Sequence, residues 1–392
     1  MFSLNTAAIL ENLRGSDSVQ ILSEYEFQKP RLAHKIRGSR WLVAGGAGSI
    51  GAAFIEQLFS FQPEYVSIVD PDENRLAELV RDLRNRYPGE FLRGLRTYSI
   101  GLGDPWFEDW LQGQPTLDYV ASFAARKHVR AERDPWSAQS MLFTNVTAHT
   151  QFLETLTSRA GDLQNVFIVS TDKAADPLSL MGASKRLLEK ILFGYVNRFP
   201  VSTSRFANVL FSAGSLSEAF LFRLQKKQPI AFPEDIQRYM ISREEGAAIC
   251  LMVAVPNSTS AIVYPKDLPR HGFLPLAKEI LSQLKLTGKL YALSEHSRAL
   301  DILDRNLEEG YWPLIATNTQ TGGEKDQEIF FEESEIQLEF PIKCFGAVQG
   351  SPLQDTEMDF TRPPHEWWDK LPEIFPGFNL PDYSRPSLDT KI

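Results

Sequence analysis

The sequence predicts an α/β protein built on a Rossmann-type doubly wound parallel sheet, followed by a smaller mixed α/β lobe. From Arg40 onward, short apolar runs alternate with segments of helical periodicity, a rhythm typical of parallel strands joined by crossover helices. A glycine-rich turn joins the first apolar run to the first helical segment. After about Asn208 the alternation loosens and proline becomes frequent, which indicates the second lobe.

The expected elements follow one another in order along the chain. Residues 6–13 predict an amphipathic helix ahead of the sheet. The first strands and helices of the sheet are WLVAG, SIGAAFIEQLFSF, YVSIVD, ENRLAELVRDLRNRY, RTYSIG and DPWFEDWL. The later ones are LDYVASFAA, AQSMLFTNVTAHTQFLETLTSR, NVFIVS, a helix after Pro177, and VSTSRFANV. Apolar strands of this length, separated by helices, are expected to pair in parallel.

The composition argues against several classes of function. The formal net charge is -9, with acidic residues spread along the chain, whereas a nucleic-acid-binding surface is normally basic. Cys250 and Cys344 stand alone, and the six histidines lack metal-ligand spacing, so we expect a reducing compartment, no disulfide and no metal site. The N-terminal apolar run is too short for a signal peptide or a membrane span. We therefore expect a cytoplasmic protein that acts on a small polar ligand.

The segment VAGGAGSIG, residues 43–51, joins the first strand to the first helix. Its glycines have the spacing of a dinucleotide-binding turn: the first permits a tight turn, the second lets the backbone approach a pyrophosphate, and the third allows close helix packing. The helix N-terminus supplies amide donors to the anion. The cofactor-binding residues expected in this loop are Gly45, Gly48, Ser49, Ile50 and Gly51.

Asp70 ends the second strand, at the position where an acid accepts hydrogen bonds from the adenosine ribose and repels a 2'-phosphate. This residue favours NAD over NADP as the cofactor. Two alternatives remain open, because Asp70 could instead cap the helix that begins near Asp72, and Arg75 could accommodate a phosphate. Asp104, after the third strand, is placed either to border the adenine or to cap the next helix.

The segment from Ser170 to Lys190, STDKAADPLSLMGASKRLLEK, joins a strand to a helix. Ligands bind at the carboxyl ends of such strands, and the helix presents Met181 and Lys185 on one face. A thioether cannot accept a proton, so proton transfer would fall to other groups, with Asp172 and Lys173 as the candidates, since a carboxyl and an amine in one pocket shift each other's pKa values. The alternative is a surface salt bridge, with the methionine filling the core.

Several motifs together carry a resemblance to a known family. They are AARKHV (124–129), TNV (144–146), STDKA followed by MGASKR, SRFANVLFSAGS (204–215), QRYMI (237–241) and GGEKDQEIFFE (322–332). This set resembles the extended short-chain dehydrogenases of polysaccharide biosynthesis, the CapD-like group, and within it the UDP-N-acetylglucosamine 4,6-dehydratases. The resemblance covers roughly residues 20 to 340.

The resemblance implies an enzyme in which NAD(P)+ accepts hydride from C4 of the sugar, the ketone acidifies H5, water leaves from C6, and hydride returns to C6. It implies Lys173 as the base at C5, Asp172 as the acid for the departing C6 hydroxyl, and Thr171 near the C4 hydroxyl. Short-chain dehydrogenases usually carry a tyrosine base four residues before the lysine. Some members of this family carry methionine there, so Met181 marks a subgroup, and Lys185 is expected to bond the nicotinamide ribose.

The resemblance assigns further residues to the cofactor and the substrate. Those implied at the cofactor are Ala124, Asn145, Ser170 and Lys185. Those implied at the substrate are Lys127, His128, Asn208, Ser215, Arg238, Glu324 and Lys325. Arg238 is expected at the diphosphate, because a guanidinium binds two oxygens at once; a solvated charge is the alternative. A lone histidine such as His128 is more often structural.

These features predict an NAD-dependent nucleotide-sugar 4,6-dehydratase whose expected substrate is UDP-N-acetylglucosamine. Two alternatives remain, a nucleotide-sugar epimerase that shares the C4 oxidation and a non-catalytic NAD-binding regulator. The expected parts are an N-terminal helical extension (1–38), an NAD-binding Rossmann domain (39–207), and a region that is mainly substrate-binding lobe and C-terminal tail (208–392). By resemblance, helices at about 134–158 and 181–199 are expected to form a homodimer or a higher homo-oligomer.

Overall fold

The computed structural model describes residues 4–15, 21–128, 132, 134–206, 208–255, 260–318, 328–354, 358–381 and 383. The chain forms two compact units. Unit 1 consists of Met1–Gln20, Ala207–Gly246 and Asp267–Glu328. Unit 2 consists of Ile21–Phe206, Ala247–Lys266 and Ile329–Ile392. Neither unit is therefore one continuous segment of chain.

Unit 2 is built on a nine-stranded sheet with the order β14-β15-β10-β6-β5-β4-β1-β2-β3. The parallel strands are β1 (Arg40–Ala44), β2 (Tyr65–Val69), β3 (Leu95–Tyr98), β4 (Tyr119–Ser122), β5 (Asn165–Val169), β6 (Val201–Ser204) and β10 (Ala261–Pro265). The antiparallel strands at one edge are β15 (Phe345–Gln349) and β14 (Gln337–Leu338). This sheet confirms the predicted fold class.

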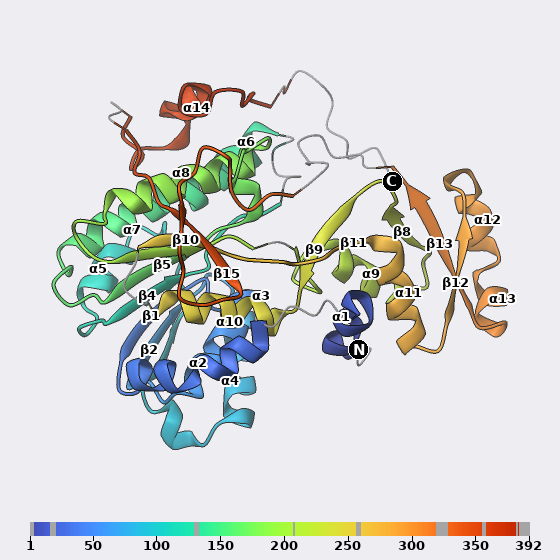
Figure 1. Cartoon of the computed structure of the whole chain (residues 1–392), viewed down its shortest axis with the longest axis horizontal. Coiled ribbons are helices and arrows are strands. Elements are labelled where there is room, and N and C mark those ends of the chain that lie inside the picture. Colours follow the sequence, from blue (N-terminus) through green and yellow to red (C-terminus); the bar gives the residue numbers. More distant parts are fainter. Residues whose placement is uncertain are drawn as a thin grey trace. The chain divides into compact units, whose positions relative to one another are not determined.

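Helices cover both faces of this sheet, which explains why the residues of its central strands β4, β5 and β6 are almost all buried. Figure 1 shows one layer that contains α5 (Phe107–Gln112), α6 (Pro135–Leu142), α7 (Ala148–Thr157) and α8 (Leu180–Gly194). The opposite layer contains α2 (Ile21–Ile36), α3 (Ser49–Phe59), α4 (Glu73–Arg86) and α10 (Arg243–Ala254). The single helix expected over 138–159 is interrupted by a π-helical turn, η3 (Phe143–Thr147), between α6 and α7. Short 3-10 turns lie at η1 (Gly89–Leu92) and η4 (Asp172–Ala174).

The strand order reverses at β1, which pairs with β2 on one side and with β4 on the other. The carboxyl ends of β1 and β4 therefore border the topological switch point, where ligands bind in open α/β sheets. The loop after β5 lies next in order, since β5 pairs with β4. The glycine loop and the STDKA segment thus follow neighbouring strand ends of one sheet.

Unit 1 contains two three-stranded sheets, with the orders β11-β9-β7 and β12-β13-β8. The strands of the first are β7 (Asn208–Val209), β9 (Gln237–Ile241) and β11 (Arg270–Gly272), and those of the second are β8 (Ile230–Pro233), β12 (Thr287–Tyr291) and β13 (Tyr311–Thr317). The helical elements are α1 (Thr6–Arg14), α9 (Leu216–Gln225), α11 (Phe273–Gln283), η5 (Leu293–Glu295), α12 (His296–Asp301) and α13 (Leu303–Glu308). The smaller mixed lobe predicted after the Rossmann sheet corresponds to this unit.

The boundaries of the units do not coincide with the expected parts. The helix predicted over residues 6–13 is confirmed as α1, but α1 belongs to unit 1 and α2 to unit 2, so the 1–38 extension divides between them. The reason is that α1 buries Ile9 and Leu10 in the core of unit 1. Residues 247–266 and 329–392 belong to unit 2, because β10 extends the large sheet beyond β6 and β15 pairs with β10.

The C-terminal segment packs on the helices α6 and α7 of unit 2. It contains η6 (Pro364–Glu366), η7 (Trp368–Lys370) and α14 (Leu371–Ile374). Its anchor is Trp367, which is 2% exposed. Thr147 Oγ1 donates to Arg362 O at 3.0 Å, and Gln151 Nε2 donates to Thr361 O at 2.9 Å. The aromatic tail therefore covers part of the helix pair that the resemblance implied for subunit contact.

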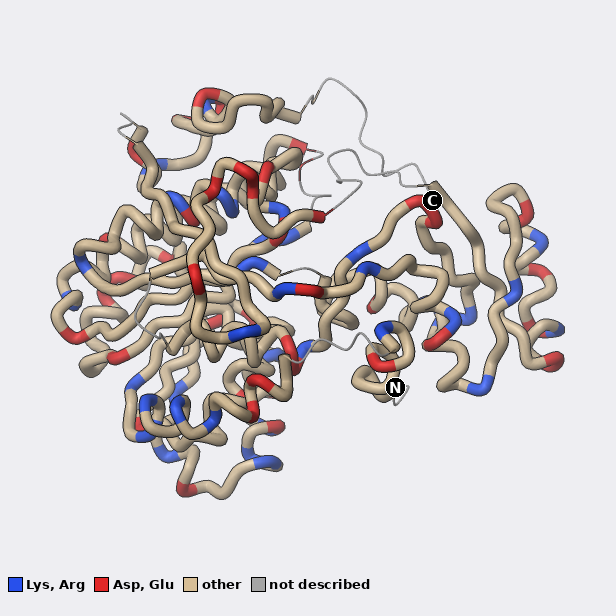
Figure 2. Tube along the Cα trace, viewed as in Figure 1, with Lys and Arg blue, Asp and Glu red and all other residues tan. Residues whose placement is uncertain are grey.

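Charged residues of both signs are interspersed along the chain, as Figure 2 shows. This distribution agrees with the formal net charge of -9 spread over acidic residues without blocks. Among the described helices, none combines the length and the apolar character needed to span a bilayer. Within the same residues, no three His, Cys, Asp or Glu side chains come together as a candidate metal site.

Candidate active site

The glycine loop between β1 and α3 has the shape that its sequence predicts. Gly45 has a φ of +68°, and a Cβ at this position would lie 2.4 Å from the backbone nitrogen of Ala124. Only glycine fits there, because both the conformation and the space exclude a side chain. A Cβ at Gly51 would lie 2.5 Å from the carbonyl oxygen of Gly45, so α3 packs directly on the turn. Gly48 is the N-cap of α3 and brings no side chain to the helix N-terminus.

Asp70 holds this loop against the end of β2. It is 8% exposed, and its Oδ2 accepts a hydrogen bond from the backbone N–H of Ala47 at 3.0 Å. Its Oδ1 accepts from the N–H of Asp72 at 2.9 Å. Burial raises the pKa of Asp70. The cap of α4 is Asp72, whose side chain accepts from the N–H of Arg75, so Asp70 is not that helix cap. A carboxylate has about four acceptor positions, which leaves room for ribose hydroxyls.

The other residues predicted in the cofactor region lie in loops and first turns. Ser49 and Ile50 form the half-buried first turn of α3. Asp104 follows β3, where its Oδ2 accepts from the N–H of Gly101 at 2.9 Å and its carbonyl accepts from the N–H of Phe107 at 2.9 Å. This pattern closes the turn before α5. A contact of Asp104 with adenine stays a prediction.

Asn145 is fully buried in the π-helical turn η3. Its Oδ1 accepts from the N–H of Arg126 at 2.8 Å, and its Nδ2 donates to Arg126 O at 2.9 Å and to Ser184 Oγ at 3.0 Å. The side chain therefore fastens the loop after β4 to α8. A π-bulge is frequent at functional sites, and the expected contact of Asn145 with the cofactor stays a prediction.

The STDKA segment places an acid, an amine and a hydroxyl together after β5. Asp172 is 2% exposed, and its Oδ1 accepts from Thr171 Oγ1 at 2.7 Å. Lys173 Nζ lies 3.5 Å from Asp172 Oδ2, and the Lys173 side chain is 29% exposed. The carboxylate is thus buried while the amine reaches the surface of unit 2. This geometry differs from the surface salt bridge that was the alternative for these two residues.

Helix α8 brings Met181 and Lys185 to the same region. Met181 is 4% exposed and its N–H donates to Glu132 Oε1 at 2.8 Å. Lys185 is also 4% exposed, and within the described part of the chain its buried Nζ has no hydrogen-bond partner. Burial lowers the pKa of Lys185 to about 8, against an opposing effect of Glu189. A buried amine without a partner is costly, so this atom marks a place where a ligand group fits.

Glu189 is a residue of this region that the sequence reasoning missed. It is 3% exposed, and its Oε1 accepts from Ser170 Oγ at 2.6 Å and from Arg205 Nε at 2.8 Å. Its Oε2 accepts from Arg205 Nη2 at 2.6 Å and from Arg186 Nη1 at 3.2 Å. The hydroxyl of Ser170, which was predicted at the cofactor, therefore donates a hydrogen bond to the Glu189 carboxylate. The only local signal for Glu189 was its place four residues after Lys185.

His149 is a second missed residue, fully buried on α7. Its Nδ1 lies 2.9 Å from Thr144 O, and its Nε2 lies 2.9 Å from Ser122 Oγ. A carbonyl oxygen can only accept, so Nδ1 carries the proton and Ser122 donates to Nε2. Burial, reinforced by the nearby Lys185, lowers the pKa of His149 to about 3. The ring is therefore a neutral structural group, and no spacing in the sequence pointed to it.

The residues predicted at the substrate divide between the two units. Lys127 and His128 lie in the exposed loop after β4 in unit 2. Ser215 is the N-cap of α9 in unit 1, and its Oγ accepts from the N–H of Glu218 at 3.2 Å. Asn208 and Arg238 both contact Glu328 in unit 1. The predicted residues Glu324 and Lys325 lie outside the described residues.

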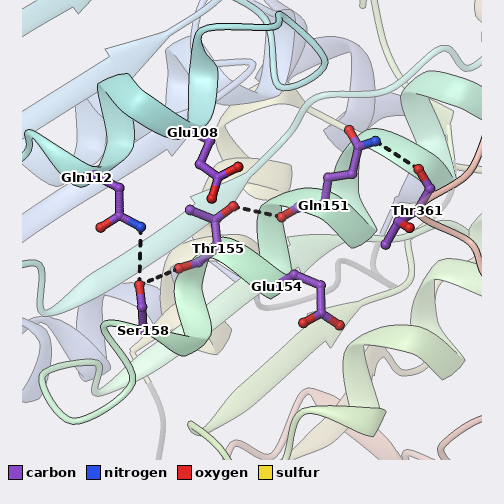
Figure 3. Close-up of a pocket in the computed structure, with 7 residues that line it drawn as sticks. All are labelled: Glu108, Gln112, Gln151, Glu154, Thr155, Ser158 and Thr361. Carbon is purple, nitrogen blue, oxygen red and sulfur yellow. Dashed lines mark hydrogen bonds between the residues drawn. The ribbon is translucent and has the colours of Figure 1, made fainter.

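A surface pocket of about 290 Å³ lies on unit 2 away from these residues. It is lined by α5, α7 and the C-terminal segment, through Glu108, Gln112, Gln151, Glu154, Thr155, Ser158 and Thr361. In Figure 3, Gln112 Nε2 donates to Ser158 Oγ at 3.3 Å, and Gln151 Nε2 donates to the carbonyl oxygen of Thr361 at 2.9 Å. The lining contains no residue that the sequence predicted for the site, so the pocket gives no support to the predicted chemistry.

Comparisons with known proteins show the family to which the chain belongs. The family model described as polysaccharide biosynthesis protein matches residues 41–308. The probable polysaccharide biosynthesis protein EpsC of Bacillus subtilis is 28% identical over 224 residues, which are 56% of this chain and 36% of that protein. The inverting UDP-N-acetylglucosamine 4,6-dehydratase of Campylobacter jejuni is 24% identical, with 83% of this chain and 87% of that protein covered. A UDP-glucose 4-epimerase of Rickettsia prowazekii is 25% identical, with 63% and 68% covered. The chain thus spans about a third of the length of the first of these relatives.

Solved structures show the same fold at low sequence identity. The structure of Pen from Bacillus thuringiensis has a TM-score of 0.64 and 18% identity, with 83% of this chain and 91% of that chain covered. The Bordetella bronchiseptica enzyme WbmG, solved in complex with NAD, has a TM-score of 0.51 and 16% identity, with 76% and 86% covered. These likenesses establish the fold.

Proposed function

The chain belongs to the polysaccharide biosynthesis protein family, and we propose that it is an NAD-dependent nucleotide-sugar 4,6-dehydratase that acts on UDP-N-acetylglucosamine. The observation that carries the proposal is the buried Asp172, bonded to Thr171 and paired with Lys173 at the end of β5. A 24% identical match to the inverting UDP-N-acetylglucosamine 4,6-dehydratase of Campylobacter jejuni, over 83% of this chain, supports the reaction and the donor.

The residues at the switch point fit NAD. Gly45 forms the tight turn beside Ala124, and Gly48 at the N-cap of α3 leaves the backbone open to a pyrophosphate. Asp70 presents a carboxylate at the end of β2 for the adenosine ribose and disfavours a 2'-phosphate. Arg75, the alternative partner of such a phosphate, pairs with Asp72 at 3.2 Å. Lys185 has an amine suited to the nicotinamide ribose. NAD, when bound, would take up hydride from C4 of the sugar and supply it again at C6.

The proton transfers fall to Asp172 and Lys173. The Lys173 amine would remove the proton from C5, while the Asp172 carboxyl would donate its proton to the departing C6 hydroxyl, which leaves as water. Lys173 then holds one proton more and Asp172 one fewer. When hydride is added at C6, Lys173 would return its proton to C5. The proton that the C4 hydroxyl releases on oxidation would pass to solvent, and Asp172 would regain its proton from solvent for the next turnover. Thr171, which donates to Asp172, would orient the acid and approach the C4 hydroxyl.

The competing function is a nucleotide-sugar 4-epimerase, favoured by the match to the Rickettsia enzyme. Both reactions start with oxidation at C4, but an epimerase needs no acid for a leaving hydroxyl. The buried Asp172 beside an amine therefore favours dehydration. We assign nucleotide recognition to Asn208 and Arg238, and contacts with the sugar to Lys127 and His128.

The proposal is tested by the mass of the product formed from UDP-N-acetylglucosamine, and in parallel from GDP- and dTDP-linked sugars, with NAD present. A dehydratase releases a product lighter by one water. A product of unchanged mass with a new stereocentre would support the epimerase. A protein that binds NAD and converts no donor would support a non-catalytic regulator.

A further inference from the structure

The small sheet β11-β9-β7 of unit 1 brings polar groups to one of its faces. Asn208 on β7 pairs in register with Met240 on β9, and Arg238 lies two residues before Met240. Residues opposite each other, and residues two apart on one strand, share a face of a sheet. The same rule places His271, which pairs with Arg238, on this face. Within the described part of the chain, the buried Nε2 of His271 has no hydrogen-bond partner.

The Glu328 carboxylate links Asn208 on β7 to Arg238 and Tyr239 on β9. Its Oε1 accepts from Asn208 Nδ2 at 2.8 Å and lies 3.3 Å from Arg238 Nε. Its Oε2 accepts from the backbone N–H of Tyr239 at 2.9 Å. Glu328 is 5% exposed and Arg238 is 4% exposed. Asn208 and Arg238, which the sequence resemblance assigned to the substrate, thus both contact the buried carboxylate of Glu328. The resemblance did not assign Glu328 to the site.

These bonds orient the side chains of Asn208 and Arg238. Asn208 Nδ2 also donates to Tyr239 O at 3.3 Å, and both of its neighbours are acceptors. The amide nitrogen must therefore face the protein, which leaves Asn208 Oδ1 as the acceptor for a ligand hydroxyl. Arg238 meets Glu328 with its Nε and Gln237 O with its Nη1 at 3.0 Å, so the plane of its guanidinium is fixed.

We infer that Glu328 is the positioning residue of a diphosphate-sugar subsite, in which Arg238 donates to the diphosphate and Asn208 Oδ1 accepts from a hydroxyl of the nucleotide sugar. The inference rests on the proposed nucleotide-sugar substrate. Glu328 acts through its two partners and does not itself meet the phosphates, since a carboxylate would repel them. An ion pair that served stability alone would not need to orient the Asn208 amide as well.

The test is calorimetric binding of nucleotides to the full chain with NAD present, for wild type, Glu328→Gln, Arg238→Gln and the double variant. The probes are UDP and UMP, with GDP and GMP or dTDP and dTMP used instead if wild type prefers those diphosphates. We expect Glu328→Gln to weaken diphosphate binding about tenfold, because a charged hydrogen bond that fixes Arg238 is lost. Monophosphate binding should change much less, and the double variant should bind the diphosphate no worse than Arg238→Gln.

Matched variants distinguish a loss of positioning by Glu328 from a change in net charge and from a failure to fold. Glu234→Gln removes the same charge from an exposed position of unit 1 and should bind both nucleotides as wild type does. If Glu328→Gln fails to fold, Glu328→Asp keeps the charge but shortens its reach, and it should weaken diphosphate binding selectively. Equal losses for both nucleotides, or additive effects in the double variant, would overturn the inference and leave the proposed function standing. A wild-type protein that binds none of these diphosphates would contradict the proposed function itself.

Discussion

Glu189 and Arg205 form a bidentate ion pair, joined by two hydrogen bonds, in the interior of unit 2. Arg205 Nε donates to Oε1 at 2.8 Å and Nη2 donates to Oε2 at 2.6 Å. Arg205 is fully buried, and its guanidinium also reaches Glu335 at 2.8 Å and the carbonyl of Phe330 at 2.8 Å. Since Ser170 donates to Glu189, this network holds the residue that precedes the proposed catalytic triplet Thr171–Lys173.

The first prediction concerns stability. Arg205→Met removes the side-chain bonds through which Arg205 joins Glu189 to Glu335, and it leaves Arg186 to compensate both carboxylates. We expect a loss of about 3–5 kcal/mol in the free energy of unfolding, as for other buried pairs broken on one side. Urea denaturation at neutral pH measures it. Arg81→Met is the matched control, because Arg81 pairs with Glu78 on the exposed surface of α4, where less than about 1 kcal/mol is expected.

The same comparison has a pH dependence whose sign is fixed. Burial opposes ionisation of Glu335, but the bonds from Arg205 outweigh burial and hold its pKa at about 2, below the ordinary 4.5. A carboxylate with a lowered pKa stabilises the fold above its ordinary pKa, and that contribution is lost as the pH falls through the lowered value. The stability gap between wild type and Arg205→Met should therefore be constant at neutral pH and shrink between pH 4.5 and about 2. A gap that grows on acidification would contradict this account of the network.

The second prediction concerns Lys185. Burial lowers its pKa to about 8, and Glu189 on the next turn of α8 raises it. A protonated amine donates hydrogen bonds to ribose hydroxyls more strongly than a neutral one, so we expect product formation to fall as the pH rises through about 8. Burial lowers the pKa of the neighbouring His149 to about 3, so its ring stays neutral over this range. Glu189→Gln should move the alkaline limb of kcat/KM to lower pH; an unmoved limb would show that Glu189 does not act on Lys185.

The third prediction concerns the glycine loop. Gly45→Ala would place a methyl group 2.4 Å from the backbone nitrogen of Ala124 and force alanine to a φ of +68°. We expect loss of measurable NAD binding, because the turn that approaches the pyrophosphate cannot form. Gly161→Ala is the control, since a Cβ at Gly161 meets nothing within 4 Å. Calorimetric titration with NAD measures both. Wild-type affinity in Gly45→Ala would mean that the cofactor binds elsewhere.

The fourth prediction concerns the acid and the base. Asp172→Asn and Lys173→Met should each reduce product formation by about 10²–10⁴-fold while NAD binds normally. Hydride removal from C4 precedes the step that needs Asp172, so Asp172→Asn should accumulate NADH and keto sugar, visible by the absorbance of NADH. Asp176→Asn, an exposed change on the same segment, should behave as wild type. Unchanged turnover in the first two variants would remove both residues from the mechanism.

Most of the large sheet could be predicted from the sequence because its strands, helices and first turn each leave a pattern within a short segment of chain. The strands β1, β2, β4 and β5 are short, mainly apolar runs between helical segments, and the glycine spacing places the turn after β1. The spacing of Met181 and Lys185 likewise determined that they share a face of α8. The return of residues 261–265 and 345–349 to this sheet was not predicted, because pairing between segments so far apart leaves no periodic signal.

The sequence did not reveal the buried residues that support the site, namely Glu189, Glu328 and His149. Glu189 meets Arg205 and Glu328 meets Asn208 and Arg238 only after folding, across separations that exceed any local spacing. Charged residues in a sequence are usually read as solvated, and their burial becomes evident only when the partners are placed. His149 is the extreme case, since its neutral state depends on a serine and a carbonyl contributed by other segments.

The central claim, that the C4 hydride is carried to C6 while water is lost, is tested most directly with UDP-N-acetylglucosamine deuterated at C4 of the sugar. Incubated with the protein and NAD, this substrate should give a product lighter by one H2O that retains the deuterium, which NMR should locate at C6. Retention of the full mass with an inverted C4 centre would contradict the dehydratase in favour of an epimerase. No conversion of this donor, or of its GDP and dTDP counterparts, would contradict catalysis on nucleotide sugars altogether.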